Sequence, residues 1–243
     1  MMLLKKEKLK EILLAMVYPA RCPLCDDLML PGEKKPCGDC LPLLEAGLQG
    51  NHCMRCGKFI STEEEYCGDC KRRQHDFDGG WGLLPYQKEY RQAMVRFKFH
   101  GRQEYGAFYG RFMAEHTVTL RNQWNPQVIL PVPMHKRKEA MRGYNQAGLL
   151  AEYFSKSCGI PVRNDLIKRV GRTKPMKELN PNQRRANLRQ AFTAKEEVQQ
   201  YKRVLLLDDI YTTGSTADAL ARILKEKGVK KVYILTLCTG IGF

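Results

Sequence analysis

The chain of 243 residues lacks an apolar run long enough to cross a membrane. A spanning helix needs about 20 consecutive apolar residues, and the longest run here, residues 12–20, has fewer than half of these. A disordered chain is also excluded, because disorder combines low hydrophobicity with high charge and 43% of these residues are hydrophobic. Acidic residues are few, since 26 Asp and Glu stand against 41 Lys and Arg, for a formal net charge of +15. We therefore expect a folded protein without a membrane span. Its positive charge fits an anionic partner, and it fits equally a basic protein that binds no such partner.

The N-terminus also lacks the pattern of a secretory signal. Its apolar run is short, Glu7 and Glu11 lie where a signal peptide avoids acids, and the residues before Cys22 form a poor cleavage sequence. Apolar residues from Leu9 to Val17 recur at helical spacing, which predicts an amphipathic helix instead. We expect a cytoplasmic protein whose cysteines stay reduced.

Cysteine is abundant and regularly spaced. Eight of the ten cysteines form four Cys-x-x-Cys pairs within 49 residues, with 11, 12 and 10 residues between successive pairs. Four such pairs in a row are typical of two tetrahedral zinc sites of four thiolates each. A disulfide framework is the alternative, but it requires an oxidising compartment that the N-terminus does not indicate. The predicted zinc ligands are Cys22, Cys25, Cys37, Cys40, Cys53, Cys56, Cys67 and Cys70.

The spacing allows two ways of sharing these cysteines. Sequential pairing gives two successive zinc ribbons, whereas a cross-brace joins the first pair to the third and the second to the fourth. Both fit the near-equal gaps, and we favour the sequential arrangement. Four thiolates leave no open coordination position, so the expected role is structural. His52 and His75 lie beside the cysteines and are expected not to be ligands.

The positive charge is concentrated in the middle of the chain. Residues 1–80 carry 12 basic and 13 acidic side chains, residues 81–202 carry 23 and 9, and residues 203–243 carry 6 and 4. Gly79 and Gly80 follow the last cysteine pair and predict a boundary there. We expect an N-terminal helix and double zinc-ribbon module over residues 1–80, and one larger domain over residues 81–243.

The larger domain alternates strand and helix patterns. Apolar runs predict strands near residues 81–86, 128–132, 204–207 and 231–237. Helical spacing of apolar residues predicts helices near 105–116 and 147–154, a third starting at Asn180 and a fourth ending at Gly228. Such alternation predicts an α/β fold with a mostly parallel sheet.

The most informative stretch is VLLLDDIYTTGST, residues 204–216. An apolar strand ends in two adjacent carboxylates, and a short Thr/Gly loop then leads into a helix. Ligands of open α/β sheets bind at this end of the strands, and a helix N-terminus offers unpaired N–H groups to a phosphate. Because carboxylates repel phosphate, we expect the two acids to bind a different group, such as sugar hydroxyls and Mg²⁺.

This stretch resembles the motif with which type I phosphoribosyltransferases bind phosphoribosyl pyrophosphate (PRPP). The resemblance implies that Asp208 and Asp209 are the catalytic acids, which hold the ribose hydroxyls and Mg²⁺. It implies that the 5′-phosphate is held by Thr212, Thr213, Gly214, Ser215 and Thr216.

The whole chain is similar to the ComF family of late-competence proteins. The four cysteine pairs are followed, in order, by KFHG at 98–101, PVPMH at 131–135, RGYNQ at 142–146 and Arg184, Asn187 and Phe192. The resemblance implies a type I phosphoribosyltransferase-like, mostly parallel sheet flanked by helices and preceded by a small zinc-ribbon module. It implies a pyrophosphate loop that includes Val132, Pro133, Lys136 and Arg137, and a flexible catalytic loop that includes Arg172, Thr173, Lys174 and Lys177. Two positions depart from the family pattern: Tyr144 stands where Phe is usual, and Met176 where Gln is common in the flexible loop.

The resemblance implies a ComFC-type protein that binds PRPP with Mg²⁺ and takes part in handling single-stranded DNA during natural transformation, alongside a ComFA-type helicase. An active phosphoribosyltransferase with an unknown acceptor is the alternative. Basic runs interleaved with Phe97, Phe99 and Tyr105 are typical of single-strand binding, although these aromatics fit a protein core equally well. The candidate nucleic-acid contacts are Arg91, Arg96, Lys98, Arg102, Arg169, Arg184, Arg185 and Arg189.

Overall fold

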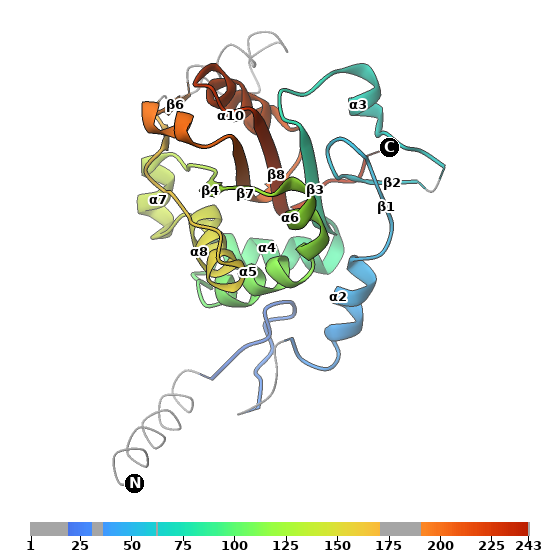
Figure 1. Cartoon of the computed structure of the whole chain (residues 1–243). Coiled ribbons are helices and arrows are strands. Elements are labelled where there is room, and N and C mark those ends of the chain that lie inside the picture. Colours follow the sequence, from blue (N-terminus) through green and yellow to red (C-terminus); the bar gives the residue numbers. More distant parts are fainter. Residues whose placement is uncertain (1–18, 31–35, 62, 171–190, 243) are drawn as a thin grey trace.

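The computed structural model describes residues 19–30, 36–61, 63–170 and 191–242. These residues form an α/β body and a cysteine-rich N-terminal segment that lies along one side of it (Figure 1). The helices expected at Leu9–Val17 and from Asn180 lie outside the described residues. Within the described part of the chain, no helix is both long and apolar enough to span a membrane.

The centre of the body is a sheet of four strands in the order β3-β8-β7-β4, and every neighbouring pair is parallel. Both faces of the sheet are covered, which explains why its central strands are runs of Val, Ile and Leu rather than alternating sequences. The expected α/β fold with a mostly parallel sheet is confirmed. The strands are β3 (Gly79–Pro85), β4 (Val128–Pro131), β7 (Arg203–Tyr211) and β8 (Lys231–Thr239).

Helices α4, α5 and α8 pack on one face of the sheet. Leu205 and Leu207 of β7 meet this layer, whose aromatic residues Phe97, Tyr105 and Phe154 have no exposed surface. Phe97 and Tyr105 are therefore core residues and cannot stack on nucleic-acid bases, whereas Phe99 keeps 62% of its surface exposed. The helices on this side are α4 (Lys88–Phe99), α5 (Tyr105–Glu115), α6 (Val118–Trp124) and α8 (Gln146–Cys158).

The opposite face of the sheet is covered by α10 and a two-stranded hairpin. Val204 and Leu206 contact the apolar side of α10, where Leu220 and Leu224 are fully buried. A short 3-10 helix, η2, joins the hairpin to β7. The elements are β5 (Ile167–Arg169), β6 (Phe192–Ala194), η2 (Glu196–Gln200) and α10 (Ser215–Glu226).

The N-terminal segment contains short elements between its cysteine pairs. These are α2 (Leu41–Gly47), β1 (Asn51–His52), β2 (Phe59–Ile60) and α3 (Gly68–Arg72). The turn after Cys56 packs directly on β3, since a Cβ on Gly57 would clash with the backbone of Gly80 and Trp81. Gly57 also has a φ of +69°, so both its conformation and its space require glycine.

Candidate functional site

The cysteines form two clusters, and each joins two successive pairs along the chain. In each cluster the four Sγ atoms lie within 4.8 Å of one another. Sγ of Cys25 is 3.8 Å from that of Cys37, and Sγ of Cys56 is 3.6 Å from that of Cys67. A tetrahedral zinc with Zn–S bonds of about 2.3 Å places its sulfurs about 3.8 Å apart. The predicted sequential pairing is therefore confirmed, and both donor sets fit zinc. We call them the first ribbon (residues 22–40) and the second ribbon (residues 53–70).

The first ribbon is attached to the body through Asp26. This residue has a φ of +73° in the turn after Cys25, where a glycine is common. Its carboxylate accepts a hydrogen bond from the Tyr105 hydroxyl, and it lies 2.9 Å from Nε and 3.1 Å from Nη2 of Arg102. Burial alone would raise the pKa of Asp26, but these donors outweigh burial and lower it. The guanidinium of Arg96 donates to the carbonyl of Leu24. Two predicted nucleic-acid contacts, Arg96 and Arg102, are thus engaged within the protein.

The acidic pair, Asp208 and Asp209, lies at the carboxyl end of β7. Successive side chains of a strand point to opposite faces. Asp208 accordingly faces α10 and lines a cavity of about 50 Å³ with residues 212–216. Asp209 is 8% exposed, and its Oδ1 lies 2.9 Å from Nζ of Lys98 on α4. Lys98, a predicted nucleic-acid contact, therefore lies at the acidic pair.

Burial raises the pKa of Asp208 to about 8, and the neighbouring charge of Asp209 acts in the same direction. The N–H of Asp209, which donates to Oδ1 of Asp208 at 2.8 Å, and the more distant Lys98 oppose this rise. Near neutral pH, burial therefore favours the protonated form of the Asp208 carboxyl. Two adjacent carboxylates with too little nearby positive charge fit a divalent cation such as Mg²⁺.

Residues 212–216, the phosphate loop, connect β7 to the first turn of α10. Gly214 has a φ of +75° and is the N-cap residue, so the chain turns there without strain. Oγ1 of Thr213 lies 2.9 Å from Oγ of Ser215. The predicted residues Thr212, Thr213, Gly214, Ser215 and Thr216 are brought together with Asp208 and Val132 around the small cavity. The arrangement offers hydroxyls and the free N–H groups of a helix N-terminus to an anion.

The predicted pyrophosphate loop follows β4, the strand beside β7. The N–H of Val132 donates to the carbonyl of Leu207 at 2.9 Å, so Val132 and Pro133 lie next to the acidic pair along the sheet edge. Lys136 and Arg137 are in the first turn of α7 (Lys136–Arg142), a helix that the sequence did not predict. A second cavity of about 680 Å³ opens beside this loop and is also lined by α8 and β5.

The RGYNQ segment at 142–146 fixes the pyrophosphate loop to its neighbours. Asn145 caps α8 by accepting from the N–H of Ala147 at 3.1 Å, and its Nδ2 donates to the carbonyl of Val132 at 3.2 Å. Arg142 donates to Oε1 of Gln146 at 2.9 Å. The departure at Tyr144 is accommodated, because its hydroxyl donates to the carbonyl of Phe97.

Several predicted residues do not contact the acidic pair or the phosphate loop, or lie outside the described residues. Arg91 is exposed on α4. Arg169 lies 5.4 Å from the ring centre of Phe192, and burial lowers its pKa. The remaining predicted residues, and the departure at Met176, lie outside the described residues: Arg172, Thr173, Lys174, Lys177, Arg184, Arg185 and Arg189.

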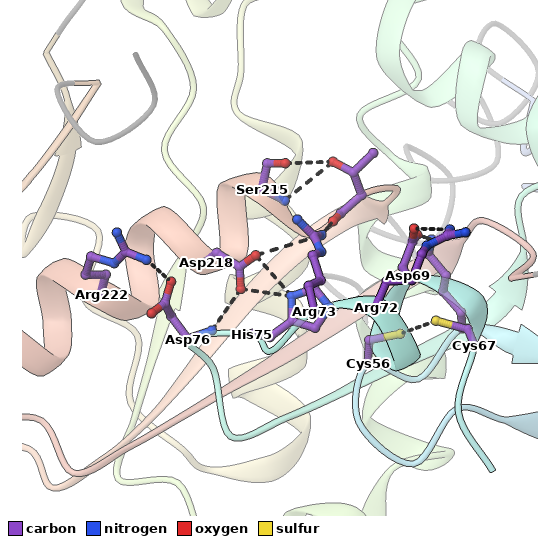
Figure 2. Close-up of polar contacts among 12 residues, drawn as sticks. Cys56, Cys67, Asp69, Arg72, Arg73, His75, Asp76, Ser215, Asp218 and Arg222 are labelled. Carbon is purple, nitrogen blue, oxygen red and sulfur yellow. Dashed lines mark hydrogen bonds and ion pairs between the residues drawn. The ribbon is translucent and has the colours of Figure 1, made fainter. Parts of the chain in front are cut away.

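Sequence reasoning missed a polar network between the end of the second ribbon and α10 (Figure 2). His75, which was expected not to bind zinc, instead donates from Nδ1 to the carboxylate of Asp218 at 3.0 Å. Arg73 donates to the carbonyl of Thr213 in the phosphate loop. These partners are more than 130 residues apart in the chain, and no local pattern connects them.

Comparison with known proteins agrees with both parts of the chain. Residues 13–71 match the double zinc ribbon domain, and residues 140–241 match the phosphoribosyl transferase domain. Competence protein F of Haemophilus influenzae is 31% identical over 189 residues, which cover 75% of this chain and 82% of that protein. The chain belongs to the ComF family.

Two further relatives of this ComF-family protein align over nearly their whole length. Competence protein ComFC of Bacillus subtilis is 28% identical over 231 residues, which cover 87% of this chain and 91% of that protein. DNA utilization protein YhgH of Escherichia coli O157:H7 is 26% identical over 226 residues, which cover 92% and 98%. The fold predicted for the ComF family, a phosphoribosyltransferase-like sheet preceded by zinc ribbons, is the fold observed here.

Proposed function

We propose that this ComF-family protein binds PRPP with Mg²⁺ at the acidic pair and the phosphate loop, and takes part in handling single-stranded DNA during natural transformation. The observation that carries the proposal is the position of Asp208, which lines the small cavity with Val132 and the phosphate loop at the carboxyl edge of a parallel sheet. The names of the relatives, two competence proteins and a DNA utilization protein, support the biological role.

Each part of PRPP has a chemically suitable neighbour in this arrangement. The 5′-phosphate suits residues 212–216, where hydroxyls and a helix N-terminus supply donors. Asp208 and Asp209 suit the ribose hydroxyls and Mg²⁺, while Lys98 offsets the charge of Asp209. The pyrophosphate suits residues 132–137, which begin next to the acidic pair at Val132 and carry Lys136 and Arg137 in the first turn of α7. The bound Mg²⁺ would neutralise part of the pyrophosphate charge.

Fewer basic residues are available for DNA contact than the net charge suggests. Arg96, Lys98 and Arg102 have partners within the protein. Arg91 keeps its side chain on the surface, and exposed basic residues are the ones able to contact phosphates of a strand. The same proposal includes a ComFA-type helicase as a partner of this protein in natural transformation.

The alternative function, transfer of ribose 5-phosphate from PRPP to an acceptor, is favoured by one observation. The cavity of about 680 Å³ beside the pyrophosphate loop has room for a second, nucleotide-sized molecule. Its lining mixes the basic residues Lys136, Lys168 and Arg169 with the acidic residues Glu139 and Glu152.

Separate titrations of Mg-PRPP and of single-stranded DNA test the proposal. Mg-PRPP should bind the wild-type protein, and Asp208→Asn with Asp209→Asn should abolish that binding while zinc content stays unchanged. The DNA affinity should fall with salt, at a slope of about −0.7 per phosphate contact on logarithmic axes. If PRPP binds without the acidic pair, the PRPP half of the proposal is contradicted. If the DNA affinity does not change with salt concentration, the DNA half is contradicted. Pyrophosphate release with an added acceptor identifies the alternative.

A further inference from the structure

The second ribbon continues directly into a segment that contacts the phosphate loop. Its last ligand, Cys70, lies on α3, and that helix ends at Arg72. The N–H of the next residue, Arg73, donates a hydrogen bond to the carbonyl of Asp69 at 3.1 Å. The geometry of the last cysteine pair therefore sets the direction in which Arg73 leaves the ribbon.

Arg73 reaches the phosphate loop from outside the ligand cavity. Its guanidinium donates to the carbonyl of Thr213 and lies 3.9 Å from the carboxylate of Asp218. Figure 2 shows Arg73 next to Asp218. A trans peptide is planar, with its C=O and N–H pointing in opposite directions. A carbonyl of Thr213 held toward Arg73 therefore turns the N–H of Gly214 the other way, away from the ribbon.

Asp218 anchors the same segment to the first turns of α10. Besides Nδ1 of His75, the N–H of Asp76 donates to Oδ1 of Asp218 at 3.0 Å. Arg222, one turn further along α10, pairs with Asp76 at 2.7 Å. The side chain of His75 is only 1% exposed. Buried, charge-assisted contacts of this kind are stronger than exposed ion pairs, so the segment and α10 are held in one arrangement.

The second ribbon also packs on the residue just before the loop. Lys58, 7% exposed, pairs with Asp69 at 2.8 Å and lies 5.9 Å from the ring centre of Tyr211. A Cβ on Gly214 would clash with the Tyr211 hydroxyl and lie 3.1 Å from Cε1 of His75. Gly214 of the loop is thus covered by Tyr211 and by His75, whereas Thr212 and Thr213 remain exposed. The first ribbon, in contrast, is attached through Asp26 to Arg102 in the turn after α4 and to Tyr105 of α5.

We propose that Arg73 is a positioning residue for the phosphate loop, through which the second ribbon sets the affinity of the site for the phosphate group of its ligand. The inference rests on the proposed function for the identity of that ligand. Arg73 acts on the loop backbone and does not touch the ligand. Its effect is therefore confined to ligands whose phosphate occupies residues 212–216.

The test compares Arg73→Ala with the matched variant Arg72→Ala. Both remove one positive charge at the end of α3, but the side chain of Arg72 is 77% exposed and pairs with the Asp69 carboxylate, at 3.3 Å, rather than with the loop. Affinities are measured for Mg-PRPP, ribose 5-phosphate and inorganic pyrophosphate. Arg73→Ala should weaken Mg-PRPP and ribose 5-phosphate about tenfold, the order of one lost hydrogen bond, and leave pyrophosphate unchanged. Arg72→Ala should change none of the three.

Equal weakening of all three ligands overturns the inference, since it indicates a general loss of charge or of folding. Arg73→Lys distinguishes the loss of positioning from a general loss of charge, because it keeps the charge but not the planar guanidinium that contacts both Thr213 and Asp218. Zinc content and melting temperature are measured for each variant: zinc content should match the wild type, and the melting temperature should fall by no more than about 4 °C, as expected for one lost hydrogen bond.

Amide hydrogen exchange of residues 212–216 in the ligand-free protein tests positioning without PRPP. Arg73→Ala should speed exchange in this loop, whereas Arg72→Ala should not, and equal rates contradict the inference. If the wild type binds no PRPP, the proposed function fails on its own, while the exchange rates still decide whether Arg73 holds the loop.

Discussion

Replacing Asp208 with Asn tests the electrostatics of the acidic pair directly. Burial raises the pKa of Asp208 from 3.8 to about 8 in the folded protein. An acid whose pKa is higher in the folded than in the unfolded state stabilises the fold while it is protonated, and this stability is lost as pH rises toward the folded pKa. From pH 6 to pH 8 the unfolded state is ionised throughout while the folded state progressively loses its proton. At 1.36 kcal/mol per pH unit, the loss is about 2 kcal/mol.

Asn has nearly the shape of Asp and does not titrate. The stability of Asp208→Asn relative to wild type should therefore rise by about 2 kcal/mol between pH 6 and pH 8. Urea unfolding of the zinc-loaded protein, without Mg²⁺ or PRPP, measures this difference. Asp165→Asn is the matched control, because Arg163 and Lys195 hold the pKa of Asp165 well below its usual range. A stability difference that stays constant with pH for Asp208→Asn would refute the reasoning.

Three further predictions follow from the contacts of the ribbons and the surface. Arg102→Ala removes one hydrogen bond and a second close charged contact from the Asp26 carboxylate and should lower the free energy of unfolding by about 2 kcal/mol, measured by urea denaturation; an unchanged value contradicts the role given to Asp26. Chelation should release two zinc ions per chain, one from each cluster, and lower the melting temperature; an unchanged melting temperature argues against structural zinc. Arg91→Ala should reduce the salt slope of DNA binding by about 0.7, whereas Arg96→Ala, whose guanidinium binds the carbonyl of Leu24, should leave the slope unchanged.

The features that the sequence predicted well are those encoded over a few neighbouring residues. The cysteine pairs, the apolar strand before Asp208 and the Thr/Gly loop are each read from one short stretch. Helix α7 was not predicted because it has no buried residue, and a helix without an apolar side gives no periodic signal. The pairs Lys98–Asp209 and Arg73–Thr213 were not predicted because each joins segments more than 100 residues apart.

The positions of those pairs change what the net charge of +15 implies. A run of basic residues along the sequence predicts a basic surface only if its side chains reach solvent together. In α4 and the turn after it, Arg96 points to the first ribbon, Lys98 to Asp209 and Arg102 to Asp26. These charges compensate buried carboxylates and carbonyls, which would otherwise carry a desolvation cost. The same run therefore joins the zinc ribbon, the sheet and the acidic pair into one body, and of Arg91, Arg96, Lys98 and Arg102 it is Arg91 that remains exposed to a polyanion.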